Sequence, residues 1–293
     1  MSMARAGMNP LELVRLPELM ARSEGSREIA VALIDGPVAL DHPALARATI
    51  RLLPGRLQGA CGLANSAACT HGTLVAGMLV AERGSGAPGI CPGCTLLVRP
   101  IFAEGVKGNG EMPSASPEEL AQAVTESVKA GARVLNVSAA LVQASPQGES
   151  SLEQALNYAG QRGAMVVAAA GNQATVGSSV ITRHPWVIPV AASDLQGRPM
   201  SESNLGSSIG RHGVSAPGES VTSLGTNGKV QSFGGTSAAA PFVSGAIALL
   251  WSLFPAASAA RLRRAILGAG GQPRRSIVPR LLDAEAAYRA MAG

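Results

Sequence analysis

The sequence feature that most restricts the fold of this chain is a run of small residues around Ser237. Residues 233–245 read FGGTSAAAPFVSG, and an apolar run continues to Trp251. This pattern predicts a buried helix with Ser237 at its entrance and Pro241 just inside, where the missing N–H costs nothing. Backbone N–H groups and the helix dipole at such an entrance favour negative charge on a bound substrate. A serine that only caps a buried helix is the alternative.

Three upstream segments supply side chains that could make Ser237 a nucleophile. Asp35 ends the apolar run IAVALID, as a carboxylate at the end of a buried parallel strand would. His71 lies in CTHGTLVAG, at the start of a helix rich in small residues. Asn172 ends a second apolar strand, MVVAAAGN. An imidazole can take the serine proton, a buried carboxylate can orient the imidazole, and an asparagine amide can donate to an oxyanion.

The order Asp35, His71, Ser237 along the chain is the order found in subtilisins. With Asn172 in its expected place between them, residues 29–267 resemble the subtilisin family of serine proteases. The resemblance assigns catalysis to the first three residues and the oxyanion hole to Asn172. It implies a serine endopeptidase that hydrolyses peptide bonds through an acyl-enzyme.

The resemblance also implies an α/β fold, the subtilisin-like three-layer arrangement with a mostly parallel central sheet flanked by helices. Apolar strands and helical patterns alternate along nearly the whole chain, which agrees with one large domain. We expect an N-terminal helical extension at 1–28, with its helix interrupted near Pro17, and a peptidase domain at 29–293. Helices are also expected at 117–130 and 150–162.

In the family, two short stretches form the walls of the pocket for the residue before the cut bond. Here they correspond to Ser138, Ala139 and Ala140 on one side and to Ala169, Ala170 and Gly171 on the other. Alanine methyl groups stand where glycines are frequent, and neither wall carries an acid. We expect an apolar, restricted pocket without a strict preference for lysine or arginine. Residues 104–116 correspond to the edge segment that pairs with an extended substrate.

The charge pattern argues against nucleic acid as a partner. The formal net charge is +5 and the pI about 9.4, but arginines concentrate only between 261 and 280. Aromatic residues are 3% of the chain, too few for a stacking platform. We find no secretory signal and no apolar segment of 18 residues, so no membrane partner is expected. If Met1 is the natural start, the chain is expected to be cytoplasmic, with peptide or protein substrates as partners. The sequence leaves the oligomeric state open.

No cofactor and no strong metal site are expected. Ala44 stands where the family often has a calcium-binding aspartate, and the loop at 81–88 is short. Calcium requires six or more oxygen ligands, which this sequence does not assemble. Asp41 is expected to cap the turn that follows it, and His42 to be structural.

The four cysteines, Cys61, Cys69, Cys91 and Cys94, leave several states open. They could be buried thiols, one or two disulfides, or ligands of a zinc ion, although only one pair has zinc-knuckle spacing. Redox chemistry at CPGC would need a different fold. A reducing cytosol favours thiols.

Within the family, the chain resembles the cyanobactin (patellamide-type) maturation proteases. This resemblance rests on three features: the missing secretory signal, the missing long pro-domain, and the cysteines around ACTHGT and ICPGC. The resemblance implies cleavage of leader peptides from ribosomally made precursors. Residues 36–70 are too short for the helical insertion of the macrocyclising members, which implies hydrolysis. The alternatives are a general intracellular protease that degrades unfolded proteins and a catalytically silent peptide-binding pseudoprotease.

Overall fold

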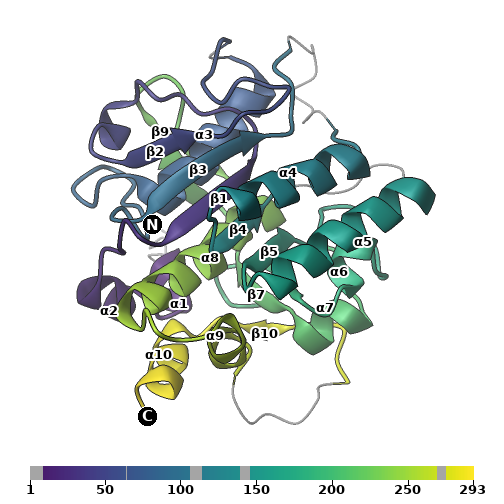
Figure 1. The fold of residues 1–293 in the computed structure, drawn as a ribbon. Coiled ribbons are helices and arrows are strands. Elements are labelled where there is room, and N and C mark those ends of the chain that lie inside the picture. Colours follow the sequence, from purple (N-terminus) through teal and green to yellow (C-terminus); the bar gives the residue numbers. More distant parts are fainter. Residues whose placement is uncertain (1–8, 64, 106–113, 139–145, 269–274) are drawn as a thin grey trace, which may run out of the picture.

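An eight-stranded parallel sheet runs through the centre of the protein (Figure 1). The computed structural model describes residues 9–63, 65–105, 114–138, 146–268 and 275–293. Its strand order is β10-β7-β6-β5-β4-β1-β3-β2, and every neighbouring pair is parallel. The strands are β1 Ala30–Asp35, β2 Thr49–Leu52, β3 Thr95–Pro100, β4 Val134–Val137, β5 Met165–Ala169, β6 Val187–Ser193, β7 Val214–Pro217 and β10 Arg280–Leu281.

Helices cover both faces of this sheet. One face packs against α3 (Ala67–Val80) and α8 (Thr236–Leu253), and the other against α4 (Pro117–Lys129) and α5 (Pro146–Gln161). Alternate strand residues point to opposite cores, so the central strands are apolar on both sides. This arrangement confirms the predicted three-layer α/β fold with a mostly parallel sheet. The predicted helix at 117–130 is also confirmed, with Ser116 accepting a hydrogen bond from the Glu119 N–H.

The remaining elements are short and lie around these layers. An antiparallel hairpin, β8 (Val221–Leu224) with β9 (Val230–Phe233), contacts α3. The short helices are α1 Pro10–Leu13, α2 Leu16–Arg22, η1 Pro43–Leu45, α6 Val180–Arg183, α7 Ser207–His212, α9 Ala259–Ile266 and α10 Ala284–Ala292. The interruption expected near Pro17 is present, and it falls at Arg15, which has a φ of 56°. Arg15 also pairs with Asp283 at 3.4 Å, and α2 packs on α10. The domain boundary after residue 28 stays a prediction.

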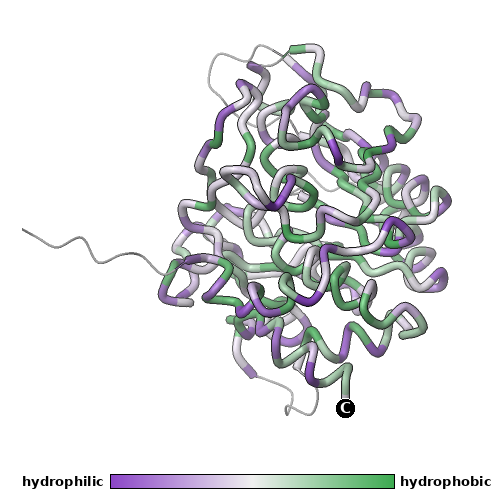
Figure 2. Tube along the Cα trace, turned by 90° about the vertical axis from the view of Figure 1, so that its left-hand side faces the viewer, coloured by the Kyte–Doolittle hydropathy of each residue, from purple (hydrophilic) through white to green (hydrophobic). Residues whose placement is uncertain are grey.

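The helix α8 corrects the expectation that no apolar segment reaches 18 residues. It has 18 residues and a mean hydropathy of 1.4, enough by length and composition to cross a membrane. However, 89% of it is buried within the protein, as expected for the central helix of a globular core. Figure 2 shows hydrophobic positions concentrated in the interior and hydrophilic ones mostly at the periphery.

Two local expectations are wrong. Because α8 begins at Thr236, Pro241 lies in its second turn, where an N–H would have donated to the Ser237 carbonyl. Its missing donor therefore does remove a helical hydrogen bond. The turn at η1 is capped by His42, whose Nδ1 accepts from the Ala44 N–H, instead of by Asp41. The structural role expected for His42 agrees with this bond.

Candidate active site

The two side chains at the centre of the candidate site are Asp35 and His71. Asp35 ends β1 and its side chain is fully buried, while the His71 side chain is 15% exposed. His71 Nδ1 lies 2.7 Å from Asp35 Oδ1, and the same oxygen accepts the Gly36 N–H at 2.6 Å. A carboxylate at Nδ1 fixes the imidazole ring and leaves Nε2 to act on another group.

Glycines let the backbone of α3 approach the end of β1 closely enough to form this pair. A Cβ atom at Gly72 would collide with the carbonyl oxygen of Pro37, and one at Gly36 would collide with that of Ala68. Beyond the glycines, Thr73 Oγ1 accepts the Ala39 N–H at 2.9 Å. The strand end and the helix therefore meet backbone to backbone, with His71 beside Asp35.

Charge and burial act on His71 in opposite directions. Burial of the imidazole lowers its pKa, whereas the negative charge of Asp35 and the hydrogen bond to it raise the pKa. The net result is a His71 pKa above its ordinary value of 6.5. The carboxylate thus stabilises the protonated imidazole. A base that accepts a proton during a reaction requires this stabilisation.

Ser237 lies in the first turn of α8 and is half-buried. The helices α3 and α8 pack against each other, and the Phe233 ring meets the His71 ring edge-on at 6.3 Å. In the described part of the chain, the Ser237 hydroxyl has no hydrogen-bond partner. The structure therefore brings Asp35 and His71 into direct contact and Ser237 onto an adjoining element, and the role of Ser237 as nucleophile stays a prediction.

Asn172 is held against the residue that precedes Ser237. Its Oδ1 accepts hydrogen bonds from the Thr236 N–H at 2.9 Å and from the Thr236 hydroxyl at 3.0 Å. The Thr236 hydroxyl oxygen in turn accepts the Gly171 N–H at 3.1 Å. With Oδ1 engaged, the exposed amide of Asn172 keeps Nδ2 as a donor close to the start of α8. Ser237 lies in this first helical turn, where the N–H groups of Thr236, Ala238 and Ala239 already have acceptors.

The predicted substrate pocket is described in part. Ser138 follows β4 and is buried, and Ala169 and Ala170 are buried at the end of β5. Ala139 and Ala140 lie outside the described residues, as does 106–113 of the expected edge segment. The apolar character of the pocket stays a prediction.

Comparison with known proteins agrees with this geometry. The sequence profile described as the subtilase family, Peptidase S8, matches residues 26–276. The chain belongs to the subtilase family of serine peptidases. The fold and the resemblance seen in the sequence are thereby confirmed.

Among curated subtilases, subtilisin DY of Bacillus licheniformis is 29% identical over 258 residues, 86% of this chain and 87% of that protein. Thermostable alkaline protease of Halalkalibacterium halodurans is 34% identical over 197 residues, 67% of this chain, and the match spans only 51% of that longer relative.

Among solved subtilase structures, the protease domain of PatA has a TM-score of 0.80 and 30% identity, covering 92% of this chain and 97% of that one. The prenylagaramide maturation protease PagA has a TM-score of 0.80 and 29% identity, and the match covers 95% of this chain and 99% of that one. The PatG macrocyclase domain shares the fold, with a TM-score of 0.81 and 20% identity. The match covers 98% of this chain and 99% of that one.

One residue of this subtilase that supports the site was missed in the sequence. Asn204 Oδ1 accepts the Gln173 and Thr175 N–H groups, and its Nδ2 donates to the Ala170 carbonyl at 3.1 Å. These bonds fix the loop that carries Asn172. The sequence signal was absent because Asn204 sits in a polar stretch about thirty residues away from the loop it binds.

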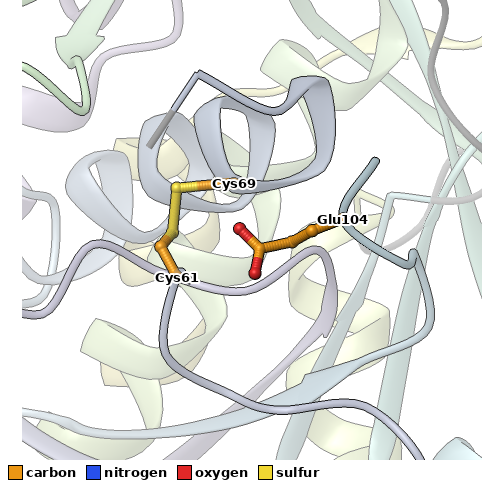
Figure 3. Close-up of side chains that lie close together, drawn as sticks. All are labelled: Cys61, Cys69 and Glu104. Carbon is orange, nitrogen blue, oxygen red and sulfur yellow. A yellow bond between two sulfur atoms is a disulfide. The ribbon is translucent and has the colours of Figure 1, made fainter. Parts of the chain in front are cut away.

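The cysteines are resolved as one disulfide and two free thiols, which corrects the expectation of thiols for one pair. Cys61 and Cys69 form a disulfide beside Glu104 (Figure 3). Cys91 and Cys94 are buried and free. A hydrogen bond with Cys94, together with burial, holds the pKa of the Cys91 thiol well above its ordinary value.

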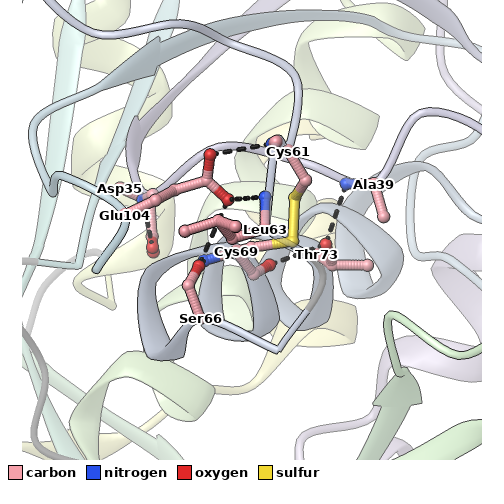
Figure 4. The surroundings of a disulfide bond; sticks show 10 residues. Asp35, Ala39, Cys61, Leu63, Ser66, Cys69, Thr73 and Glu104 are labelled. Atoms are coloured by element: carbon pink, nitrogen blue, oxygen red, sulfur yellow. Dashed lines mark hydrogen bonds between the residues drawn. A yellow bond between two sulfur atoms is a disulfide. The ribbon is translucent and has the colours of Figure 1, made fainter. Parts of the chain in front are cut away.

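A zinc site built from all four cysteines is therefore excluded in this subtilase. Among the described residues, the one group of three metal-ligand side chains that lies close together is Cys61, Cys69 and Glu104. Its two sulfurs are bonded to each other and offer no thiolate. Glu104 is also engaged, because its carboxylate accepts the Gly62 and Leu63 N–H groups at 2.8 and 2.9 Å (Figure 4).

Proposed function

We propose that this subtilase is an endopeptidase that cuts ribosomally made precursor peptides. The observation that carries the catalytic part is the 2.7 Å contact between the His71 imidazole and the buried Asp35 carboxylate. Such a pair is the base that a serine hydroxyl needs before it can attack a peptide carbonyl.

In the proposed reaction, His71 Nε2 takes the proton of Ser237 as its Oγ attacks the carbonyl carbon. Asp35 stabilises the imidazolium that results. Asn172 Nδ2 and the Ser237 N–H donate to the oxyanion, and a positioned donor of this kind lowers the barrier by about 3 kcal/mol. His71 then protonates the leaving amine, and water hydrolyses the acyl-enzyme. Every group in this scheme belongs to the chain, and no cofactor takes part.

The proposed substrate class rests on similarity to PatA and PagA, whose structures are named as maturation proteases. Both match this chain over more than nine tenths of its length at 29–31% identity. A precursor peptide is extended and lacks fixed structure, so it can pair with an exposed strand edge. We propose the cytoplasm as the place of this activity, because ribosomally made precursors originate there, and the Cys61–Cys69 disulfide would have to persist in that reducing compartment.

The test of the nucleophile is covalent labelling. Wild-type protein is expected to react with a fluorophosphonate probe at Ser237, located by mass spectrometry of the digest, and Ser237→Ala is expected to remain unlabelled. Ser232→Ala, a change on the exposed strand β9, serves as the matched control and should label like wild type. Folded wild-type protein that does not label would refute the nucleophile and leave a peptide-binding pseudoprotease.

The test of the substrate class compares two digests. A precursor peptide with its leader is expected to be cut at one bond, and unfolded casein is expected to remain largely intact under the same conditions. Many cuts in casein would favour the general intracellular protease and contradict precursor processing. Adding a serine-protease inhibitor should abolish whichever cleavage is seen.

A further inference from the structure

A chain of hydrogen bonds crosses the otherwise apolar contact between α8 and the sheet. The Ser244 hydroxyl donates to Asn136 Oδ1 at 2.8 Å, and Asn136 Nδ2 donates to the Ser138 hydroxyl at 3.1 Å. Ser244 and Asn136 are fully buried, and Ser138 is 5% exposed. Both functional ends of the Asn136 amide are thus bonded, one to a helix and one to the end of its own strand.

The positions of these residues connect two parts of the candidate site. Asn136 lies within β4, opposite Leu33 of β1 and Val167 of β5. Ser244 follows Ser237 by about two turns of α8, so both face the same side of the helix. Figure 1 shows α8 beside β4 and β5, and the contacts between these elements agree.

Because the contact between α8 and the sheet is otherwise apolar, these hydrogen bonds fix the position of the helix relative to the strand. The neighbours of α8 on this face are aliphatic side chains of the core, such as Val134 and Val167, whose apolar contacts are not directional. An unpaired buried amide or hydroxyl, in contrast, loses its bond to water and gains none in return. The helix and the strand are therefore held in one register by the bonds at Asn136.

A second bond extends this constraint to the strand that carries Asp35. The Ser138 N–H donates to the carbonyl of Ile34 at 3.3 Å, one residue before Asp35. Ser138 is thus fixed through its side chain to α8 and through its backbone to the end of β1.

We propose that Asn136 and Ser244 are positioning residues that set the place of Ser138, one wall of the substrate pocket, relative to Ser237. This inference rests on the proposed function. It adds that the pocket wall and the nucleophile are held together by a buried amide bridge. Extended peptide substrates, which must contact Ser138 and Ser237 together, depend on this bridge. A small phosphonylating probe needs only Ser237 and its base.

The test removes one hydroxyl and compares two reactions. Ser244→Ala is expected to lower kcat/KM for an extended peptide by about tenfold, as the loss of one buried hydrogen bond allows, mainly through KM. Its rate of labelling by a small fluorophosphonate should stay within about twofold of wild type. Ser127→Ala is the matched control, because the Ser127 hydroxyl is buried in α4 without a partner among the described residues.

A second variant tests the other end of the bridge. Ser138→Ala should produce a similar rise in KM, and Ser244→Ala combined with Ser138→Ala should cost less than the sum of the two changes. The inference would be overturned if the losses of the two single variants added up in the double variant. It would also be overturned if Ser244→Ala hydrolysed the peptide with the same kinetics as Ser127→Ala. Equal losses in labelling and peptide hydrolysis would also overturn it. If Ser244→Ala does not fold, the KM of Ser138→Ala decides. Wild-type protein that does not label would instead remove the proposed function.

Discussion

The protonation state of His71 is the residue-scale property on which the proposed chemistry depends. The pKa of this imidazole is raised, because the charge of Asp35 and the hydrogen bond to it outweigh burial. Proton transfer from a serine requires the neutral form, so catalysis should be lost as the pH falls through a value above 6.5. The stability of the folded state depends on pH in the opposite direction. A raised folded-state pKa stabilises the fold fully below the unfolded-state pKa, and this contribution is lost as the pH rises through the folded-state pKa.

Replacing Asp35 by asparagine tests the source of this shift. Asp35→Asn keeps the shape but removes the charge, so the acid limb of the pH–rate profile should move to lower pH. The kcat at neutral pH should fall on the order of 10⁴-fold. The measurement is kcat/KM against pH for a peptide substrate, with Asp194→Asn, a half-buried carboxylate that pairs with Arg198, as control. An acid limb that stays in place would contradict the assignment of Asp35.

The individual residues of the site differ in how far the sequence could predict them. Asp35, His71 and Asn172 each lie within or directly after an apolar or small-residue run, so local pattern and chemistry pointed to them. Asn204 could not be found in this way, because its bonds reach a loop distant along the chain. The pairing of Cys61 with Cys69 likewise depends on a Cα–Cα distance of 5.5 Å that only the folded chain defines.

At the scale of elements, the N-terminal end of α3 is fixed from two sides. Gly72 lets its backbone touch the end of β1, and the Cys61–Cys69 disulfide ties its first turn to the preceding loop. Glu104 accepts two N–H groups of that loop and the Ser66 hydroxyl, and Ser66 caps the helix. The helix that presents His71 is thus anchored close to that residue.

Removal of the disulfide should destabilise the fold. The combined change Cys61→Ser and Cys69→Ser is expected to lower the free energy of unfolding by about 2–3 kcal/mol, since a short closed loop is released in the unfolded chain. Urea denaturation with and without dithiothreitol measures this. Reductant should lower the stability of wild type and leave the double variant unchanged. Four reactive thiols in denatured, unreduced wild-type protein would contradict the disulfide.

The elements themselves were predictable to different degrees for physical reasons. The helix α4 could be predicted to within a residue because its serine cap, first-turn acids and apolar spacing agree. The break between α1 and α2 was placed at a proline, yet it occurs at Arg15, which adopts a left-handed conformation. That conformation accompanies packing of α2 against α10, almost the whole chain away.

On the scale of the whole molecule, the fold is held by two apolar layers against one parallel sheet. Among the described residues, the one cluster of three metal-ligand side chains includes both disulfide sulfurs. Ala44 offers no carboxylate at the position where the family resemblance in the sequence suggests a calcium ligand.

Chelation should therefore leave the thermal stability of the protein unchanged. The Tm measured by calorimetry is expected to be the same in excess EDTA and in millimolar calcium, because a strongly bound ion that stabilises the folded state is not expected here. Magnesium serves as the control for ionic strength. A Tm that falls in EDTA and recovers with calcium would reveal a strong cation site.

The order of the candidate residues along the chain has a consequence for the timing of synthesis. The three residues proposed for catalysis are at positions 35, 71 and 237, and Ser237, the proposed nucleophile, lies on α8. A ribosome-bound chain that has not yet released α8 has neither the hydroxyl nor the helix that covers β4 to β7. Any activity of the proposed site therefore has to wait until α8 has been made, because Ser237 is synthesised long after Asp35 and His71.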